Sequence, residues 1–217
     1  MTIVSGRFDD RALLLYAVTD RSWLGGRTLA HDVEEVLRGG ATMIQLREKE
    51  LDFEKSLAEA FEIKAVCKKY GVPFIVNDSV ELALACGADG IHVGQSDVDA
   101  RRARERLGGD KIVGVSAQTV EQAVLAEKSG ADYLGVGAVF TTSTKKDADF
   151  VPGDTLRTIC GAVGIPVVAI GGINAYNIGK LRGFGIKGTA LISALFAEKN
   201  IFEATARMRK LSEETVK

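Results

Sequence analysis

The sequence predicts a single (β/α)8 barrel, an α/β fold in which eight parallel strands close into a ring inside a layer of helices. Eight short runs rich in Val, Ile and Leu recur along the 217 residues, and they are continuous rather than alternating, as in parallel strands that are covered on both faces. Segments of helical composition lie between these runs. The length allows about 27 residues for each strand and its helix, which is near the lower limit for this fold.

The eight expected strands are short, and polar residues follow most of them. They cover residues 13–20, 41–48, 73–78, 90–94, 111–117, 132–139, 166–172 and 188–193. Glycines stand between the helical segments and the next strands, where we expect left-handed backbone to end each helix. These glycines are Gly39, Gly40, Gly71, Gly87, Gly108, Gly109, Gly130, Gly164 and Gly185.

Two helical segments show their pattern most clearly. In residues 52–70 four apolar side chains repeat at i+4, which predicts a stripe that packs on the barrel. These four are Phe53, Leu57, Phe61 and Ala65. In the segment TVEQAVLAEKSG, Thr119 and Gln122 have the spacing of a capping box, which predicts the start of a helix.

The whole chain is expected to form one domain over residues 1–217, with residues 1–12 as an N-terminal lead-in. An open, doubly wound sheet is the competing fold. It would usually carry G-x-G-x-x-G after its first strand, and the sequence there is RSWLGGRTLA. The barrel is therefore the better interpretation.

Composition argues against several classes of partner. The chain has 28 Lys and Arg against 29 Asp and Glu, a net charge of -1, so no broad basic surface is expected for nucleic acid or an anionic membrane. Three widely spaced cysteines form neither a disulfide framework nor a zinc cluster and favour a reducing compartment. We therefore predict a cytoplasmic protein that acts on small molecules. The sequence leaves assembly into a homo-oligomer open.

Polar side chains follow the strands at their carboxyl ends, where barrels of this kind hold their active sites. They comprise three cations, two neutral hydrogen-bonding groups and two carboxylates: Arg47, Lys49, Lys145, Asn77, Ser116, Asp78 and Asp97. Carboxylates beside cations predict a metal-bound polyphosphate, because Mg²⁺ takes one or two carboxylates and completes its octahedron with phosphate oxygens and water. Ordinary ion pairs at the barrel rim are the simpler alternative, but agreement among five strand ends favours a ligand site.

A second anion site is expected after strands seven and eight, where loops often present backbone N–H groups to phosphate. Gly172 would allow close approach of the backbone, and Ser193 begins a short helical segment. Thr142 and Thr144 would add hydroxyl donors. The loop over residues 140–153 exceeds the ~2–6 residues usual for such connections, so it is a candidate lid, with a surface excursion as the alternative.

These motifs make the chain resemble the thiamine phosphate synthase family. QLREK, VND, HVGQSD, GVSA, TSTKKD and AIGGI stand in order at successive strand ends and span nearly the whole chain. The resemblance implies a Mg²⁺-dependent transferase that moves the 4-amino-2-methylpyrimidin-5-ylmethyl group from its diphosphate to the nitrogen of a thiazole phosphate. It also implies a dissociative mechanism that releases diphosphate. One departure is the last strand, KGTALIS, where the family pattern has an acidic residue before the glycine.

The resemblance assigns residues to each ligand. It gives Mg²⁺ to Asp78 and Asp97. It gives the pyrimidine diphosphate to Gln45, Arg47, Lys49, Asn77, Ser116 and Lys145, of which Arg47, Lys49, Ser116 and Lys145 would act in catalysis. It gives the thiazole phosphate to Thr142, Thr144, Gly172, Ile192 and Ser193.

Two other functions remain open from the sequence. A related thiazole tautomerase would need only the phosphate site and a nearby histidine, and it would leave the diphosphate and metal residues without a purpose. A non-catalytic sensor of phosphate ligands is compatible with the fold alone. His92 is expected to be a packed, hydrogen-bonded histidine, and the cysteines are expected to serve packing rather than nucleophilic catalysis.

Overall fold

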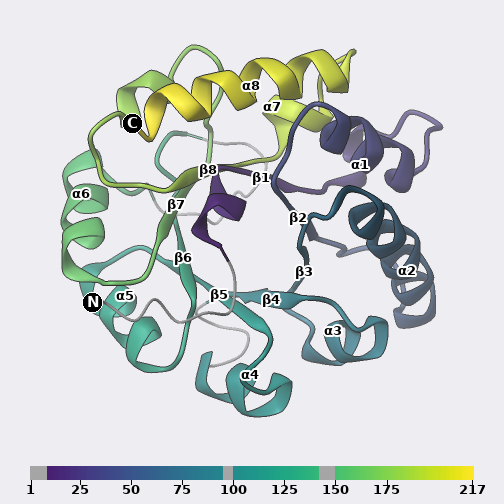
Figure 1. Cartoon of the computed structure of the whole chain (residues 1–217), viewed down its shortest axis with the longest axis horizontal. Coiled ribbons are helices and arrows are strands. Elements are labelled where there is room, and N and C mark those ends of the chain that lie inside the picture. The colour runs from purple at the N-terminus through teal and green to yellow at the C-terminus, as the bar shows by residue number, and fades with distance from the viewer. Residues whose placement is uncertain (1–8, 95–99, 142–149) are drawn as a thin grey trace.

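The computed structural model describes residues 9–94, 100–141 and 150–217. Its centre is a closed ring of eight parallel strands with helices around the outside (Figure 1), which confirms the predicted (β/α)8 class. Each strand pairs with the next one in the sequence, and β1 pairs with β8 to close the ring. The carboxyl ends of all eight strands therefore meet at one end of the barrel.

All eight strands lie within their predicted ranges and are shorter at one or both ends. Their bounds are β1 Leu15–Val18, β2 Met43–Leu46, β3 Phe74–Asn77, β4 Gly90–Val93, β5 Ile112–Ala117, β6 Tyr133–Val136, β7 Val167–Ile170 and β8 Gly188–Leu191. Polar groups that the sequence pattern included in strands, such as Arg47, thus belong to the loops that follow them.

The outer layer consists of α1 Leu29–Arg38, α2 Phe53–Tyr70, α3 Val80–Cys86, α4 Ala100–Leu107, α5 Val120–Lys128, α6 Gly153–Ala162, α7 Ser193–Phe196 and α8 Ile201–Thr215. The described residues also form three short 3-10 turns. These are η2 Arg21–Trp23, η3 Ile178–Leu181 and η1 Asp10–Leu13, which lies over the centre of the ring (Figure 1) and contributes Leu13 to the barrel interior. Residues 171–187, all of them described, contain η3 in place of an α-helix between β7 and β8. In the part of the chain that the structure describes, no helix is long and apolar enough to cross a bilayer.

The capping box at the start of α5 is confirmed, because the Thr119 side chain accepts from the Gln122 backbone and the Gln122 side chain accepts from the Thr119 backbone. The left-handed helix ends are confirmed in part. Positive φ occurs at Gly40, Gly71, Gly87, Gly108, Gly130 and Gly185, but not at Gly39, Gly109 or Gly164.

The predicted apolar stripe on α2 is wrong. Phe53, Phe61 and Ala65 are exposed and Leu57 is only partly buried. The buried face consists of Ser56, Ala60, Ile63 and Cys67. A strict i+4 repeat drifts about 40° around a helix at each step, whereas alternating steps of three and four stay on one face. The buried residues follow the second pattern, and most of them are small enough to bring the helix close to the strands.

Two layers of apolar side chains form the core. One fills the space between strands and helices, and the other fills the barrel itself with residues such as Leu13, Tyr16, Met43 and Tyr133. Gly114 on β5 makes room for the Tyr133 ring, since a Cβ there would lie 2.1 Å from a ring carbon. The barrel interior is thus packed, and it contains the two phenol rings of Tyr16 and Tyr133.

Candidate active site

A chain of buried hydrogen bonds crosses the interior of the barrel. Gln45 on β2 donates from Nε2 to the Tyr16 hydroxyl at 2.6 Å. The Tyr16 and Tyr133 hydroxyls lie 2.8 Å apart, and the Tyr133 hydroxyl lies 3.0 Å from Nδ1 of His92. His92 Nε2 then lies 3.0 Å from Oγ of Ser116 on β5. Two of the predicted site residues, Gln45 and Ser116, are therefore linked through three aromatic side chains.

Only the first donor in this chain is fixed by the geometry: the Gln45 amide donates to the Tyr16 hydroxyl. Either phenol can donate to the other, and the roles of the two His92 nitrogens depend on the tautomer of the ring. One arrangement compatible with all four contacts has Tyr16 donate to Tyr133, Tyr133 donate to Nδ1 of His92, and Nε2 of His92 donate to the Ser116 oxygen.

Both phenols in the chain stay protonated. Burial raises the pKa of Tyr16 by more than its hydrogen bonds with Tyr133 and Gln45 lower it. Burial also raises the pKa of Tyr133, and the neighbouring Tyr16 raises it further. The two phenols thus provide hydrogen-bonding groups inside the barrel without adding charge. The expectation of a packed, hydrogen-bonded His92 agrees with these contacts.

Asn77 and Asp78 follow β3. The Asn77 amide donates to Oδ2 of Asp78 at 2.5 Å, and the Asp78 backbone N–H donates to the carbonyl of His92 at 2.8 Å. Asp78 has φ of 63°, a left-handed conformation that Asp enters more readily than most residues. Ser79 then caps α3 by accepting from the Leu82 N–H. The chain turns so abruptly here that Asp78 lies between the end of a strand and the start of a helix.

Only one of the two predicted metal ligands falls within the described residues. Asp97 lies in residues 95–99, outside them, and among the described residues there is no group of three or more His, Cys, Asp or Glu side chains that could hold a metal ion. Asp78 stands at the carboxyl end of β3, beside β4, which precedes Asp97 in the chain. A carboxylate at this position suits Mg²⁺, which prefers hard oxygen ligands and often takes few of them from the protein.

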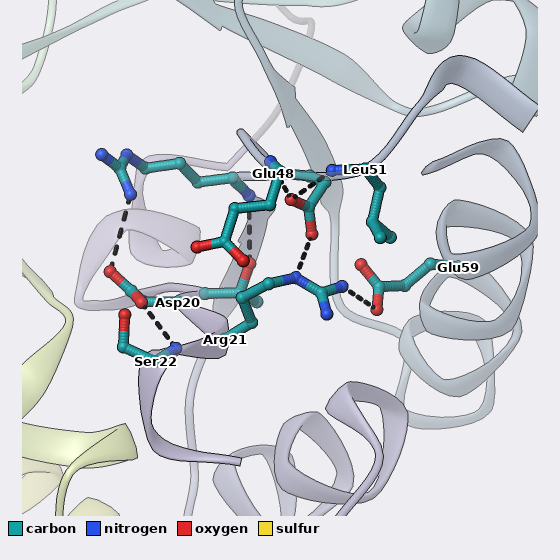
Figure 2. Close-up of polar contacts among 9 residues, drawn as sticks. Asp20, Arg21, Ser22, Glu48, Leu51 and Glu59 are labelled. Carbon is teal, nitrogen blue, oxygen red and sulfur yellow. Dashed lines mark hydrogen bonds and ion pairs between the residues drawn. The ribbon is translucent and has the colours of Figure 1, made fainter. Parts of the chain in front are cut away.

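Arg47 is held from two sides by the turn that follows β1. Its backbone N–H donates to Oγ1 of Thr19 at 3.0 Å, and its guanidinium lies 3.6 Å from Oδ2 of Asp20. Asp20 in turn caps η2 by accepting from the Ser22 N–H, as Figure 2 shows. Lys49, two residues further along the loop, is exposed. Both cations therefore lie in the loop that follows the carboxyl end of β2.

The expected phosphate site lies across the barrel, after β7 and β8. Gly172 has φ of 67°, and a Cβ there would lie 2.4 Å from the carbonyl oxygen of Thr141, so the loops after β6 and β7 approach each other closely. Asn177 donates to the Gly172 carbonyl at 2.8 Å and fixes this turn. Ile192 precedes α7, and the exposed Ser193 is its first residue.

Several predicted site residues lie outside the described ranges. Asp97 is in residues 95–99, and Thr142, Thr144 and Lys145 are in residues 142–149 together with most of the candidate lid. Among the described residues, Gln45, Asn77 and Ser116 lie at the carboxyl ends of β2, β3 and β5, and Arg47, Lys49 and Asp78 lie in the loops that follow β2 and β3. Gly172, Ile192 and Ser193 follow β7 and β8.

Sequence reasoning missed Tyr16 and Tyr133. Each is a tyrosine within a run of aliphatic residues, LLLYAVTD and DYLGVGAV, and a phenol hydroxyl buried in a barrel needs a hydrogen-bond partner. The need of each buried hydroxyl for a partner could have indicated from the sequence that these two tyrosines take part in a polar network. By contrast, the cysteines agree with their expected packing function, since burial raises the pKa of Cys67 to about 12 and that of Cys160 to about 11. These thiols are poor nucleophiles at neutral pH.

Comparison with known proteins agrees with the geometry. The family described as thiamine monophosphate synthase matches residues 15–195. The thiamine-phosphate synthase of Ruminiclostridium cellulolyticum is 48% identical over 197 residues, which cover 91% of this chain and 94% of that protein. The thiamine-phosphate synthase of Clostridium tetani is 48% identical, with 88% and 91% covered. A thiamine phosphate pyrophosphorylase structure from Pyrococcus furiosus matches with a TM-score of 0.89 and 38% identity, over 96% of this chain and 99% of that one.

Proposed function

The chain belongs to the thiamine monophosphate synthase family and is a transferase of that family, and from this premise we propose how its residues divide between two substrates. One substrate is the pyrimidinylmethyl diphosphate and the other is the thiazole phosphate. The product is thiamine phosphate, and diphosphate is released.

The pyrimidine diphosphate occupies the side of the barrel formed by β2, β3 and β5. The residues proposed to bind it are Gln45, Arg47, Lys49, Asn77, Ser116 and Lys145. Arg47 and Lys49 follow the same strand as Gln45, so a ligand whose ring lies near Gln45 would direct its diphosphate toward them. Asp78 and Asp97 would hold Mg²⁺, which supplies positive charge to the leaving group when it is bound.

The thiazole phosphate occupies the opposite side, after β7 and β8. The residues proposed to bind it are Thr142, Thr144, Gly172, Ile192 and Ser193. The turn at Gly172, held by Asn177, supports this assignment because backbone N–H groups in such turns bind phosphate in many barrels. The two substrates would then meet over the barrel interior.

The chemistry requires charge stabilisation rather than a protein nucleophile. The bond between the pyrimidine methylene carbon and the diphosphate oxygen breaks, its electron pair leaves with diphosphate, and the thiazole nitrogen forms the new bond to that carbon. Arg47, Lys49 and Lys145 stabilise the negative charge that develops on the leaving group, most strongly where water is excluded. The raised thiol pKa of Cys67 and Cys160 is consistent with a reaction that uses no cysteine.

The hydrogen-bond chain from Gln45 to Ser116 is the observation that carries this proposal. Positive charge develops on the aminopyrimidine as diphosphate departs, so the groups that contact the ring should orient it without adding a cation. The two ends of the chain, the Gln45 amide and the Ser116 hydroxyl, carry no charge, and both ring nitrogens of His92 between them are engaged by protein side chains. A tautomerase that used His92 for proton transfer would have to break one of these contacts.

A product assay tests the proposal. Purified protein with both substrates and Mg²⁺ should form thiamine phosphate and diphosphate in equal amounts, and the Asp97→Ala variant should lose the Mg²⁺-dependent activity. Isomerisation of a thiazole carboxylate phosphate that survives Asp97→Ala would instead identify a tautomerase. Binding of both substrates by calorimetry with no product from the same mixture would identify a sensor.

A cytoplasmic location remains a prediction from the sequence. The free thiols of Cys67, Cys86 and Cys160 suit a reducing compartment. We propose this location together with the function, since both substrates are small and soluble.

A further inference from the structure

An ion cluster lies behind the two cations that follow β2. Its members are Arg21 of η2, Glu48 of the loop after β2 and Glu59 of α2 (Figure 2). We propose that Arg21 and Glu48 are positioning residues for diphosphate binding: they hold the loop over residues 47–51 in the conformation that presents Arg47 and Lys49 to the ligand. This inference rests on the proposed function, because it assumes that the two cations bind the diphosphate.

Glu48 points away from the barrel interior, between its two cationic neighbours in the sequence. Residues of β2 alternate, with Met43 and Gln45 inside the barrel and Ile44 and Leu46 in the layer under the helices. Glu48 continues the outer set, and only 4% of its side chain is exposed. A carboxylate buried to this extent must be paired.

Three hydrogen bonds to the Glu48 carboxylate hold the loop. Oε2 accepts from Nε of Arg21 at 2.6 Å. Oε1 accepts from the backbone N–H groups of Glu50 at 2.6 Å and Leu51 at 3.2 Å, so the side chain closes a turn of its own backbone around Lys49 (Figure 2). The pKa of Glu48 lies below its ordinary value. Burial raises this pKa, but the hydrogen bonds from Glu50, Arg21 and Leu51 together lower it by more, so the carboxylate stays ionised at neutral pH.

Arg21 ties this turn to the rest of the fold. One guanidinium nitrogen binds Glu48, and NH2 donates to Oε1 of Glu59 at 2.9 Å, which connects the loop to the 18-residue helix α2. The planar guanidinium can serve both carboxylates at once, which a lysine could not do with the same geometry.

Three successive residues of the turn after β1 hold two neighbouring positions of the β2 loop. Thr19 accepts from the Arg47 backbone, Asp20 faces the Arg47 guanidinium, and Arg21 binds Glu48. Long cationic side chains lose conformational entropy when they bind a ligand, and a prearranged backbone reduces what must be ordered at that moment. Removal of the Arg21–Glu48 contact should therefore weaken diphosphate binding although neither residue belongs to the proposed diphosphate ligands.

Two variants and one control test this inference. Glu48→Gln keeps an oxygen that can accept from Glu50 and Leu51 but removes the charge paired with Arg21, and Arg21→Met removes the other partner. Glu62→Gln makes the same chemical change at an exposed position of α2. Calorimetry with inorganic diphosphate and Mg²⁺ measures affinity, steady-state kinetics give KM for each substrate, and thermal melts report folding.

In both variants we expect the affinity for diphosphate to fall about tenfold and the KM for pyrimidine diphosphate to rise about tenfold. A tenfold change corresponds to about 1.4 kcal/mol. The KM for thiazole phosphate should stay within about twofold, and Glu62→Gln should match the wild type. The variant that combines Glu48→Gln with Arg21→Met should bind diphosphate no more weakly than Arg21→Met alone, because the two substitutions remove the same interaction.

Unchanged diphosphate affinity in folded Glu48→Gln and Arg21→Met would overturn the inference. An equal rise in both KM values with a lower Tm would also overturn it, since that is the result of a general structural defect. Wild-type protein that binds diphosphate but forms no thiamine phosphate would contradict the proposed function alone, and the affinities of the variants would still decide the positioning of the loop.

Discussion

Tyr133→Phe tests the hydrogen-bond chain most directly. The substitution removes one oxygen from the middle of the chain and keeps the ring, which is fully buried and meets Tyr16 edge to face at 5.9 Å between centroids. It also removes a hydrogen-bond partner from the Tyr16 hydroxyl and from Nδ1 of His92. Packing is conserved, so the measured effect belongs to the hydrogen bonds.

The expected loss of stability follows from the groups left without partners. A buried polar group that loses a partner costs ~1–3 kcal/mol, so two such groups should lower the free energy of unfolding by about 2–6 kcal/mol. For a chain of this size ~1 kcal/mol shifts Tm by roughly 2–4 °C, so Tm should fall by at least about 4 °C. Urea and thermal unfolding measure both quantities.

The functional effect should be confined to one substrate. Without the Tyr133 donor, His92 can move its proton to Nδ1 and accept from Ser116, which would turn the serine hydroxyl from the ligand toward the imidazole. The loss of one hydrogen bond to the pyrimidine should raise its KM by about tenfold and leave the KM for thiazole phosphate unchanged.

Tyr176→Phe is the matched control, because Tyr176 is 96% exposed. If Tyr133→Phe changed neither Tm nor the KM for pyrimidine diphosphate by more than this control, the reasoning from the chain would be refuted. A fall in Tm with both KM values unchanged would leave the chain a stabilising feature without influence on binding.

Three further predictions concern other parts of the site. Gly172→Ala should lower the free energy of unfolding by more than about 1 kcal/mol in urea melts, because the position has positive φ and the new Cβ would lie 2.4 Å from a carbonyl oxygen. Gly179→Ala is the control and should not have this effect, because its Cβ would have no neighbouring atom within 4 Å. Burial raises the pKa of Glu59, so ionisation of this carboxyl destabilises the folded wild type as pH rises. The free energy of unfolding of Glu59→Gln should therefore increase relative to that of the wild type between pH 4 and pH 7. A difference in free energy that stays constant over this range would contradict the prediction. Lys145→Ala should weaken diphosphate binding or slow its release far more than Lys146→Ala, and equal, negligible effects would argue against the lid.

The order of elements could be predicted from the sequence because each strand is a local apolar run and the barrel needs only their alternation with helices. The orientation of a helix could not be predicted as well. On α2 the i+4 repeat from Phe53 to Ala65 predicts the buried stripe, yet the barrel packs against Ser56, Ala60 and Ile63. Packing distance, which only the folded chain determines, favoured the smaller residues over the larger ones.

The polar residues of the site follow the same distinction. Charged groups at strand ends, such as Arg47 and Asp78, could be predicted from position alone because every strand of a barrel ends on the same side. Tyr16 and Tyr133 are 117 residues apart in the sequence, and their hydroxyls meet only because β1 and β6 face each other across the barrel. No local pattern contains that contact.

The segment QLREK shows how one short stretch serves two surfaces. Gln45 faces the barrel interior, while Leu46 and Glu48 pack toward α2 and Arg21. The charged residue at position 48 therefore supports the loop, although it stands in the middle of the motif that is proposed to bind diphosphate. If the positioning inference is correct, the sign of the charge at position 48 must oppose that at position 21, and a lysine at position 48 should abolish diphosphate binding even though it adds a cation near the site. The Glu48→Lys variant thus separates two explanations, since simple attraction by total charge predicts tighter binding and loss of the prearranged loop predicts weaker binding.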